Sequence, residues 1–307
     1  MNANNLMWTA GLALALLGAP LLPGIINKIK AFFAGRRGPS LFQLYYDLAK
    51  LLRKGGVVTT ASGGVFALAP CAGLALLLAA AVLLPHGRMA SPLAFAGDFV
   101  LFFYLLGTAR FVNVLGALET GSSFEGMGAS REMQFSMLVE GVIFAVVCFV
   151  FFAFPLDSVS QFSLPFSNYA PHALSHLLVA AAFFVVLLAE NCRVPLDDPE
   201  THLELTMIHE AMILDYAGPD LALIQYGAAL KLWLFATLAV LLAVPEVSGV
   251  ADFVFFYGEV LLTGVVVGCV DSGMARFRFL KVPQMLLAAL GLVLLGLFVR
   301  IFFEKGI

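Results

Sequence analysis

The sequence predicts an all-α polytopic membrane protein with about eight transmembrane helices, and two observations carry this prediction. Of the 307 residues, 61% are hydrophobic and only 12% are charged, whereas a soluble domain carries about 25% charged residues. Apolar runs of roughly 20 residues recur along the whole chain, each long enough to cross about 30 Å of hydrocarbon as a helix. We therefore expect one membrane domain over residues 1–307 and no separate soluble domain.

Eight apolar stretches qualify as spans by length and hydropathy. They cover residues 6–26, 64–85, 97–118, 135–154, 173–190, 219–244, 253–271 and 283–303. The odd-numbered connections between them carry Lys and Arg, whereas the even-numbered connections carry almost only Arg88. By the positive-inside rule the odd connections face the cytoplasm, so both termini are expected outside.

The first connection contains its own helical pattern. Leu41, Leu44, Tyr45, Leu48, Leu51 and Leu52 recur at helical spacing, opposite a polar stripe of Gln43, Asp47, Lys50 and Lys54. This pattern predicts a cytoplasmic amphipathic helix that lies in the membrane interface. A simple topology anchor of positive charge is the alternative interpretation.

The cysteines and histidines indicate no metal or redox centre in this chain. Cys71, Cys148, Cys192 and Cys269 are widely separated and form no CxxC pair, so neither an iron–sulfur site nor a disulfide framework is indicated. His202 and His209 share a helical face, but two histidines without a third ligand give a zinc site little support. The small net charge of −3 is confined to loops and does not indicate nucleic-acid binding.

Four ionisable residues are predicted at mid-bilayer depth, away from the ends of the spans: Arg110, Glu140, Lys231 and Glu259. Each costs about 3 kcal/mol at mid-bilayer, so each is expected to face the bundle interior and to have a partner. Arg110 and Glu140 are predicted at nearly the same depth and can form an ion pair. Either this pair locks two helices, or Glu140 handles protons, which we favour. Lys231 either handles protons or pairs with an acid that the spacing does not identify.

Two connections concentrate further charge. In the fifth, Asp198 and Pro199 suit the start of a short helix that places Glu200 and Glu204 on one face. Proton uptake is one interpretation of these acids, and docking of a basic partner is the other. In the third, glycines surround Glu119, Glu125, Arg131 and Glu132, which suits a docking or hinge surface and also an ordinary loop.

At these residues the chain resembles the complex I subunit 1 family, over nearly its whole length. The matching positions are Arg37, Gly38, Pro39, Gln43, Asp47 and Lys50 in the first connection, and Ala189, Glu190, Arg193, Pro195, Asp197, Pro199, Glu200, Glu204, Leu205, Tyr216 and Gly218 in the fifth. Stretches 109–111, 119–122, 128–132 and 274–276, with Lys231, resemble the hydrogenase branch of that family. This branch comprises the formate hydrogenlyase subunit 4 and hydrogenase 4 component C type of membrane subunit in group 4 nickel–iron hydrogenases.

The resemblance implies a non-catalytic membrane-anchor subunit of an oxidoreductase complex in a bacterial or archaeal cytoplasmic (inner) membrane. Such a subunit docks a hydrophilic redox module and couples electron transfer to proton or sodium translocation. It implies no cofactor in this chain, a nickel–iron centre and iron–sulfur clusters in partner subunits, and antiporter-like membrane neighbours. The cytoplasmic partners are hydrogenase-like large and small subunits and an iron–sulfur subunit.

The resemblance also assigns expected roles to individual residues. The proton-coupling candidates are Glu140, Glu190, Glu200, Glu204, Asp197, Lys231 and Arg110. The docking candidates are Arg37, Asp47, Glu119, Arg131, Glu132 and Arg193.

A quinone-site heel subunit of respiratory complex I is the alternative function. Two departures from the family pattern argue against a quinone site: Leu196 replaces the usual Phe, and the stretch 205–216 is longer than usual. A stand-alone secondary transporter would show inverted repeats and broken helices around a midplane site. The sequence pattern indicates neither.

Overall fold

The computed structural model describes residues 3–57, 62–153, 158–159, 172–197, 207–245, 250–275, 277 and 281–303. Across these ranges the regular structure is helical, apart from an isolated bridge between His86 and Met89. The helices are α1 (Ala3–Gly18), α2 (Leu21–Phe33), α3 (Gln43–Leu52), α4 (Gly64–Leu83), α5 (Asp98–Glu119), α6 (Ser123–Ala153), α8 (Ala173–Glu190), α9 (His209–Met212), α10 (Gly218–Ala243), α11 (Val250–Gly273) and α12 (Val282–Phe302).

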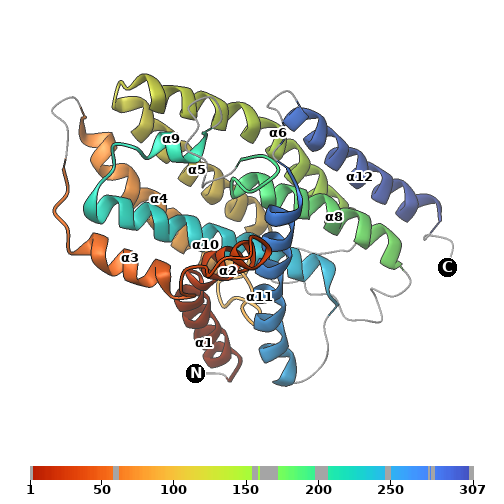
Figure 1. Ribbon diagram of the computed structural model, residues 1–307. Coiled ribbons are helices and arrows are strands. Elements are labelled where there is room, and N and C mark those ends of the chain that lie inside the picture. The colour runs from red at the N-terminus through yellow and green to blue at the C-terminus, as the bar shows by residue number, and fades with distance from the viewer. Residues whose placement is uncertain are drawn as a thin grey trace.

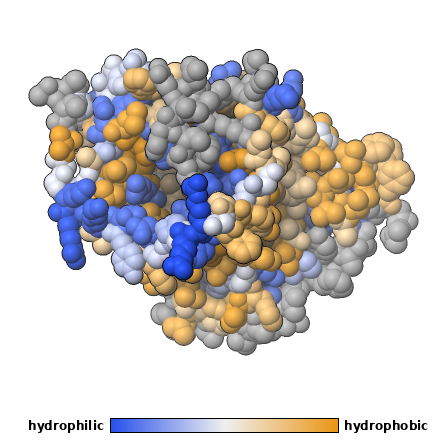
Figure 2. All heavy atoms as spheres, viewed as in Figure 1, coloured by the Kyte–Doolittle hydropathy of each residue, from blue (hydrophilic) through white to orange (hydrophobic). Residues whose placement is uncertain are grey.

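The prediction of an all-α polytopic membrane protein is confirmed. Seven of the described helices are long and apolar enough to cross a membrane, and the bent pair α1 and α2 is an eighth candidate. In Figure 2, hydrophilic side chains gather over α3, while hydrophobic side chains cover α12. This contrast fits a bundle whose helices face lipid along their sides and water at their ends.

The first predicted span, 6–26, is broken where the sequence suggested one continuous helix. Helices α1 and α2 meet at an angle of 45°, and α2 continues to Phe33. Pro20 lies at the junction, where its ring and missing N–H prevent the hydrogen-bond ladder of α1 from continuing.

Helix α3 confirms the amphipathic helix predicted in the first connection. It packs beside α2 and α10, and the Tyr45 hydroxyl donates a hydrogen bond to the Leu17 carbonyl. None of its residues is fully buried, and the side chains of Tyr46 and Leu52 are exposed. The helix therefore lies on the surface of the bundle.

Helix α6 is longer than predicted, because it begins at Ser123 rather than near residue 135. The third connection shrinks to residues 120–122, so the loop or hinge interpretation of this stretch is wrong. Of the glycines that suggested a loop, Gly128 serves helix packing instead. A Cβ at Gly128 would lie only 2.8 Å from the Ile208 carbonyl oxygen, so glycine allows the segment before α9 to approach α6 closely.

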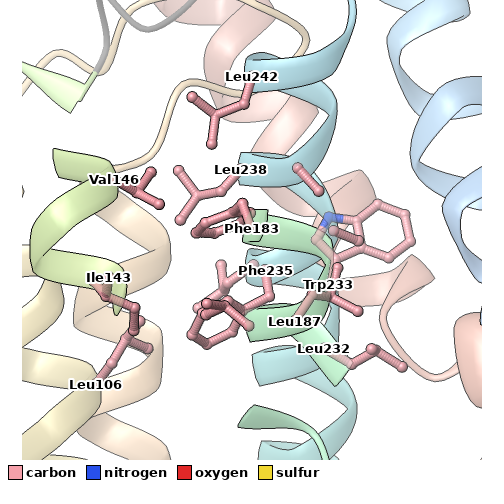
Figure 3. Packing of buried hydrophobic residues seen from close by; sticks show 14 of the residues in the cluster. Leu106, Ile143, Val146, Phe183, Leu187, Leu232, Trp233, Phe235, Leu238 and Leu242 are labelled. Atoms are coloured by element: carbon pink, nitrogen blue, oxygen red, sulfur yellow. The ribbon is translucent and has the colours of Figure 1, made fainter. Parts of the chain in front are cut away.

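Helix α10 forms the centre of the bundle and contacts α3, α4, α8 and α11 (Figure 1). In α10 72% of the most apolar stretch is buried, against 22% in α12. In Figure 3, Phe235 and Leu238 of α10 face Phe183 of α8, and side chains of α5 and α6 close the other side of this core. The packing holds Lys231, four residues before Phe235, deep inside the protein.

Candidate functional site: a buried charge cluster

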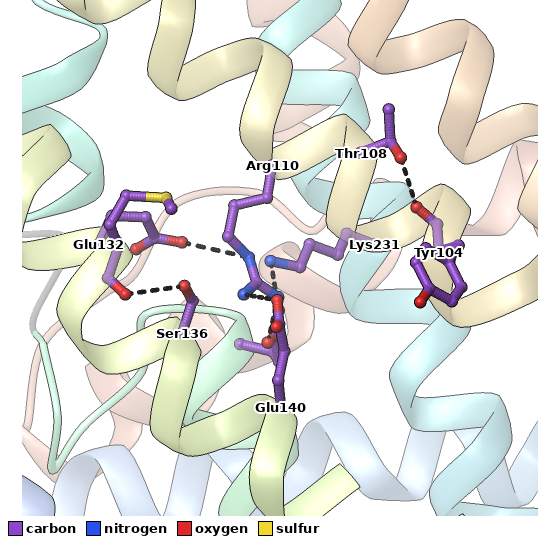
Figure 4. Close-up of polar contacts among 9 residues, drawn as sticks. Tyr104, Thr108, Arg110, Glu132, Ser136, Glu140 and Lys231 are labelled. Atoms are coloured by element: carbon purple, nitrogen blue, oxygen red, sulfur yellow. Dashed lines mark hydrogen bonds and ion pairs between the residues drawn. The ribbon is translucent and has the colours of Figure 1, made fainter. Parts of the chain in front are cut away.

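Five ionisable side chains from four helices meet near the centre of the bundle, and we call them the central charge cluster. They are Arg110 of α5, Glu132 and Glu140 of α6, Glu190 of α8 and Lys231 of α10. Figure 4 shows Arg110 between the α6 carboxylates and Lys231.

Arg110 contacts all three carboxylates of the cluster. Its Nη1 lies 3.2 Å from Oε1 of Glu140, and its Nε lies 3.7 Å from Oε1 of Glu132. Its Nη2 donates a hydrogen bond to Glu190. The planar guanidinium offers five N–H donors in a fixed fork, which suits three acceptors in different directions. The predicted proximity of Arg110 and Glu140 is confirmed.

Glu190 also pairs with Lys231, whose Nζ lies 2.8 Å from Oε2. This contact identifies the acid partner of Lys231 that the sequence left open. Glu190 is the last residue of α8, where the helix dipole disfavours a negative charge. Two cations on one carboxylate offset both this dipole and the loss of water around a buried charge.

The spacing of residues within α6 explains how its acids reach Arg110. Glu132, Ser136 and Glu140 follow one another at intervals of four and share one face of the helix. The hydroxyl of Ser136 donates to the Met133 carbonyl at 3.1 Å, so it does not compete for Arg110. Glu132 was predicted as a docking residue, and the structure places it in the cluster.

The cluster has more negative than positive groups. Two cations face three carboxylates, which leaves a net charge of −1 when all five groups are ionised. The Glu190 side chain is 2% exposed, whereas that of Glu140 is 60% exposed. An uncompensated charge is costly in a low dielectric, so uptake of one proton or approach of one cation stabilises the cluster.

A cavity of about 230 Å³ reaches the cluster. Its lining includes four cluster members, Arg110, Glu132, Glu190 and Lys231, together with Asp197, Arg193, Cys192, His209 and Glu210. A polar space of this size can hold ordered water molecules, each of which needs two to four polar partners. Burial lowers the pKa of His209 and the nearby Glu210 carboxylate opposes that shift, whereas burial raises the pKa of the Cys192 thiol.

Two of the other described candidates, Asp197 and Arg193, line this cavity, and Arg131 bonds to the chain just before α9. Asp197 accepts a hydrogen bond from the Ile208 N–H at 3.2 Å, and Arg193 places Nη1 3.8 Å from Oδ2 of Asp271. Arg131 donates from Nη1 to the Met207 carbonyl at 3.0 Å. These three residues therefore fix the ends of the fifth connection.

The remaining docking candidates occupy surface positions. Glu119 accepts a hydrogen bond from the Phe66 N–H, which ties the end of α5 to the start of α4. Asp47 accepts from Gln43 Nε2 at 3.1 Å, and Arg37 is exposed. Glu200, Glu204 and the helix predicted after Asp198 lie outside the described residues.

A second ion-pair group lies near the start of α11. Nη2 of Arg88 is 3.0 Å from Oε2 of Glu259, and its Nε is 3.6 Å from Oδ2 of Asp252. Glu259 was expected to have a partner, but Arg88 lies in a connection far away in the sequence. Periodicity alone gives no signal for that pairing.

Within the described ranges, no group of three or more His, Cys, Asp or Glu side chains is arranged to hold a metal ion. The four cysteines are free, and none is paired in a disulfide. The side chains of the central charge cluster themselves offer acid–base and electrostatic chemistry.

The fold and site define a multi-pass all-α membrane protein with an ionised cluster inside its helical bundle. The chain belongs to the NADH dehydrogenase family, whose model matches residues 7–301. Hydrogenase-4 component C of Escherichia coli is 33% identical over 87% of this chain and 86% of its own length. Formate hydrogenlyase subunit 4 of the same organism is 30% identical over 91% of this chain and 92% of its own.

More distant relatives include a subunit of the NADH-quinone oxidoreductase of Rhodobacter capsulatus, which is 26% identical over 87% of this chain and 81% of its own length. Among solved structures, a chain of the membrane-bound sulfane sulfur reductase, an archaeal respiratory membrane complex, superposes with a TM-score of 0.82. The superposition covers 97% of this chain and 99% of the reductase chain. Because the two sequences are only 18% identical, this similarity supports the fold alone.

Proposed function

We propose that this chain is the membrane-anchor subunit of a group 4 nickel–iron hydrogenase-like complex of the formate hydrogenlyase or hydrogenase 4 type. It docks a hydrophilic redox module and couples electron transfer to translocation of protons or sodium ions. The observation that carries this proposal is the buried contact of Glu190 with both Arg110 and Lys231, in the wall of a cavity that further charged side chains also line. The two relatives of at least 30% identity support the hydrogenase branch.

The geometry suggests how coupling operates. Glu190 shares Arg110 with Glu132 and Glu140, so a proton gained by one carboxylate changes the field at the others. The cavity extends this cluster towards Asp197 and the fifth connection, where the redox module would dock. A charge change in the module would then shift the proton affinity of the cluster, and the cluster would pass the change onward through α6.

The redox chemistry would reside in partner subunits that carry the nickel–iron centre and iron–sulfur clusters. Hydrogenase-like large and small subunits and an iron–sulfur subunit would bind the cytoplasmic ends, through Arg37, Asp47, Glu119, Arg131, Glu132 and Arg193. Glu132 and Arg193 would act from beneath this surface, because both line the cavity. Antiporter-like membrane subunits would continue the ion pathway in a bacterial or archaeal inner membrane.

The second candidate is a quinone-site subunit of a complex I-like enzyme. Apolar residues of the cavity lining, including Leu74, Leu77 and Leu106, favour this alternative. Its volume of about 230 Å³ opposes it, because pockets that bury drug-sized ligands usually measure about 300–1,000 Å³.

The first experiment purifies the complex in mild detergent through a tag on this chain. Co-purifying subunits are identified by mass spectrometry, and nickel and hydrogen turnover are assayed. Nickel with a hydrogenase-like large subunit supports the proposal, whereas a nickel-free assembly with quinone reductase activity transfers the assignment to the second candidate. Recovery of this chain alone contradicts both.

The second experiment measures ion translocation per turnover after reconstitution into vesicles. Glu190→Gln should lower this ratio by at least about fivefold, because an amide cannot carry the charge that two cations stabilise. Asp215→Asn is the matched control, since Asp215 is exposed and outside the cluster. An unchanged ratio in Glu190→Gln would remove Glu190 from the coupling machinery.

A further inference from the structure

A groove of about 590 Å³ opens along the side of the bundle between α5 and α6. Its walls carry exposed aromatic and apolar side chains from both helices, among them Tyr104, Phe111, Met133 and Phe144. These side chains recur at helical spacing on one face of each helix, so the groove runs along the helix axes. A neighbouring helix fits this shape by the ridge-into-groove packing that helices commonly use.

Glu140 lies in this groove, and its side chain is 60% exposed. Opposite it, Gly107 presents no side chain, and a Cβ there would lie 3.9 Å from Oε1 of Glu140. The wall of the groove beside the carboxylate is therefore backbone at this position. Small residues at such points allow the backbone of a second membrane helix to come close.

Glu140 lies inside the apolar part of α6, five residues after residue 135, where the predicted span begins. Its partner Arg110 lies 12 residues after the start of α5 and nine before its end. A charged side chain that faces lipid at mid-bilayer costs about 2.5–3.5 kcal/mol on insertion scales. Lipid is therefore an unfavourable neighbour for an exposed Glu140 carboxylate.

Charge balance defines the chemistry that the groove requires. The central charge cluster carries a net charge of −1 when ionised, and Glu140 is its most exposed acid. Arg110 is the only basic residue among the described residues that line the groove, and it already serves three carboxylates. Among the described residues, no second basic side chain lines the groove, so a basic group of a neighbouring subunit would complement the Glu140 carboxylate.

We propose that a transmembrane helix of a neighbouring membrane subunit fills this groove and presents a Lys, Arg or His side chain to Glu140. The inference rests on the proposed function in one respect, that this chain works within a membrane complex. The resulting ion pair would neutralise the cluster. A change in the protonation of the cluster would then alter the electrostatic field at the basic residue of the neighbouring subunit. Arg110 lines both the cavity and the groove, so it links the two.

Site-specific photo-crosslinking tests the occupant of the groove. A benzophenone amino acid replaces Tyr104 or Phe144 in the groove, or Leu287 or Leu294 on the exposed face of α12 as controls. The tagged complex is irradiated in native membranes, purified, and digested for peptide sequencing. Both groove positions should attach to one transmembrane helix that carries a basic residue within one turn of the depth of Glu140. The α12 positions should not attach to that helix.

Attachment of the groove positions to lipid alone would overturn the proposal, and so would a crosslinked helix without a basic residue at that depth. A protonated Glu140 against lipid would give the first of these results. Continued co-purification of the redox subunits would then leave the proposed function intact. Absence of any partner subunit would contradict the proposed function instead.

Charge reversal provides the second test. Glu140→Lys should lower the yield of the crosslinked subunit by at least about tenfold, because two cations then face each other at low dielectric. Replacing the partner's basic residue with Glu in the same background should restore the yield to within about twofold of wild type. Failure of this exchange, in a complex that still assembles around wild-type Glu140, would overturn the proposed ion pair.

Discussion

Lys231 places its ammonium nitrogen 2.8 Å from Oε2 of Glu190 and thereby joins the centre of α10 to the last residue of α8. The Glu190 carboxylate is almost fully buried, so the pair is isolated from the screening that weakens surface ion pairs. The contact ties together two helices that also pack through apolar side chains of the core, such as Phe183 and Phe235.

Substitutions of the two partners of this pair should be coupled and not additive. Lys231→Met brings the net charge of the ionised cluster to −2, and Glu190→Gln leaves the Lys231 ammonium without the carboxylate that it contacts, so each change is expected to cost about 3–5 kcal/mol. The double variant should lose less than the sum of the two single losses. Thermal unfolding in detergent measures the stability of the wild type, the two single variants and the double variant. Strictly additive losses would show that the two residues do not interact.

Arg110→Lys keeps the positive charge of the central charge cluster but removes the planar guanidinium, so it tests the geometry of this side chain separately from its charge. A lysine ammonium cannot reproduce the fork that reaches Glu132, Glu140 and Glu190, so at least one carboxylate loses its partner. We expect a stability loss of about 1–3 kcal/mol, as for a buried polar group left unsatisfied, and a lower ratio of translocated ions to turnover. Arg53→Lys on the exposed end of α3 is the matched control and should change neither quantity.

Gly24 should tolerate no side chain, because α2 meets the chain before α3 at this point. A Cβ on Gly24 would lie 2.2 Å from the Leu41 carbonyl oxygen, which is backbone and cannot rotate away. Gly24→Ala should therefore destabilise the protein by about 1–3 kcal/mol, in the range of other overpacking changes. Gly291→Ala is the control, since no atom lies within 4 Å of its Cβ position.

Alanine at residue 291 should be neutral or stabilising by up to about 1 kcal/mol, because it lowers the entropic cost of forming the helix. Equal melting temperatures for the two variants would show that α3 moves to accommodate the methyl group at residue 24. The comparison thus tests whether the amphipathic helix is fixed against the bundle.

The sequence predicted the pairing of Arg110 and Glu140 because hydropathy gives depth in the membrane, and two consecutive spans are usually neighbours. It did not predict the contact between Lys231 and Glu190, since depth does not reveal which distant spans pack side by side. The length of α6 was missed for a different reason. Gly126 and Gly128 have low helix propensity, but close packing against α9 stabilises the helix around them.

His86 should make the stability of the protein sensitive to acid. The ring is buried in the connection after α4, with Nε2 2.8 Å from the Ala81 carbonyl oxygen and its plane beside Trp8. Burial lowers the pKa of His86 from 6.5 to about 4, although the hydrogen bond to Ala81 opposes this shift. The imidazole is therefore neutral in the folded protein at neutral pH.

Because the folded protein resists protonation of His86, the unfolded chain binds the proton first as the pH falls. The contribution of His86 to stability is complete above pH 6.5 and is lost as the pH falls towards about 4. The melting temperature in detergent should therefore decrease across this window. His86→Gln retains a side chain that can donate to Ala81 but cannot titrate there, so its melting temperature should fall less steeply. Parallel curves for the variant and the wild type would assign the acid sensitivity to other groups, such as the Asp252 and Glu259 carboxylates that hold Arg88.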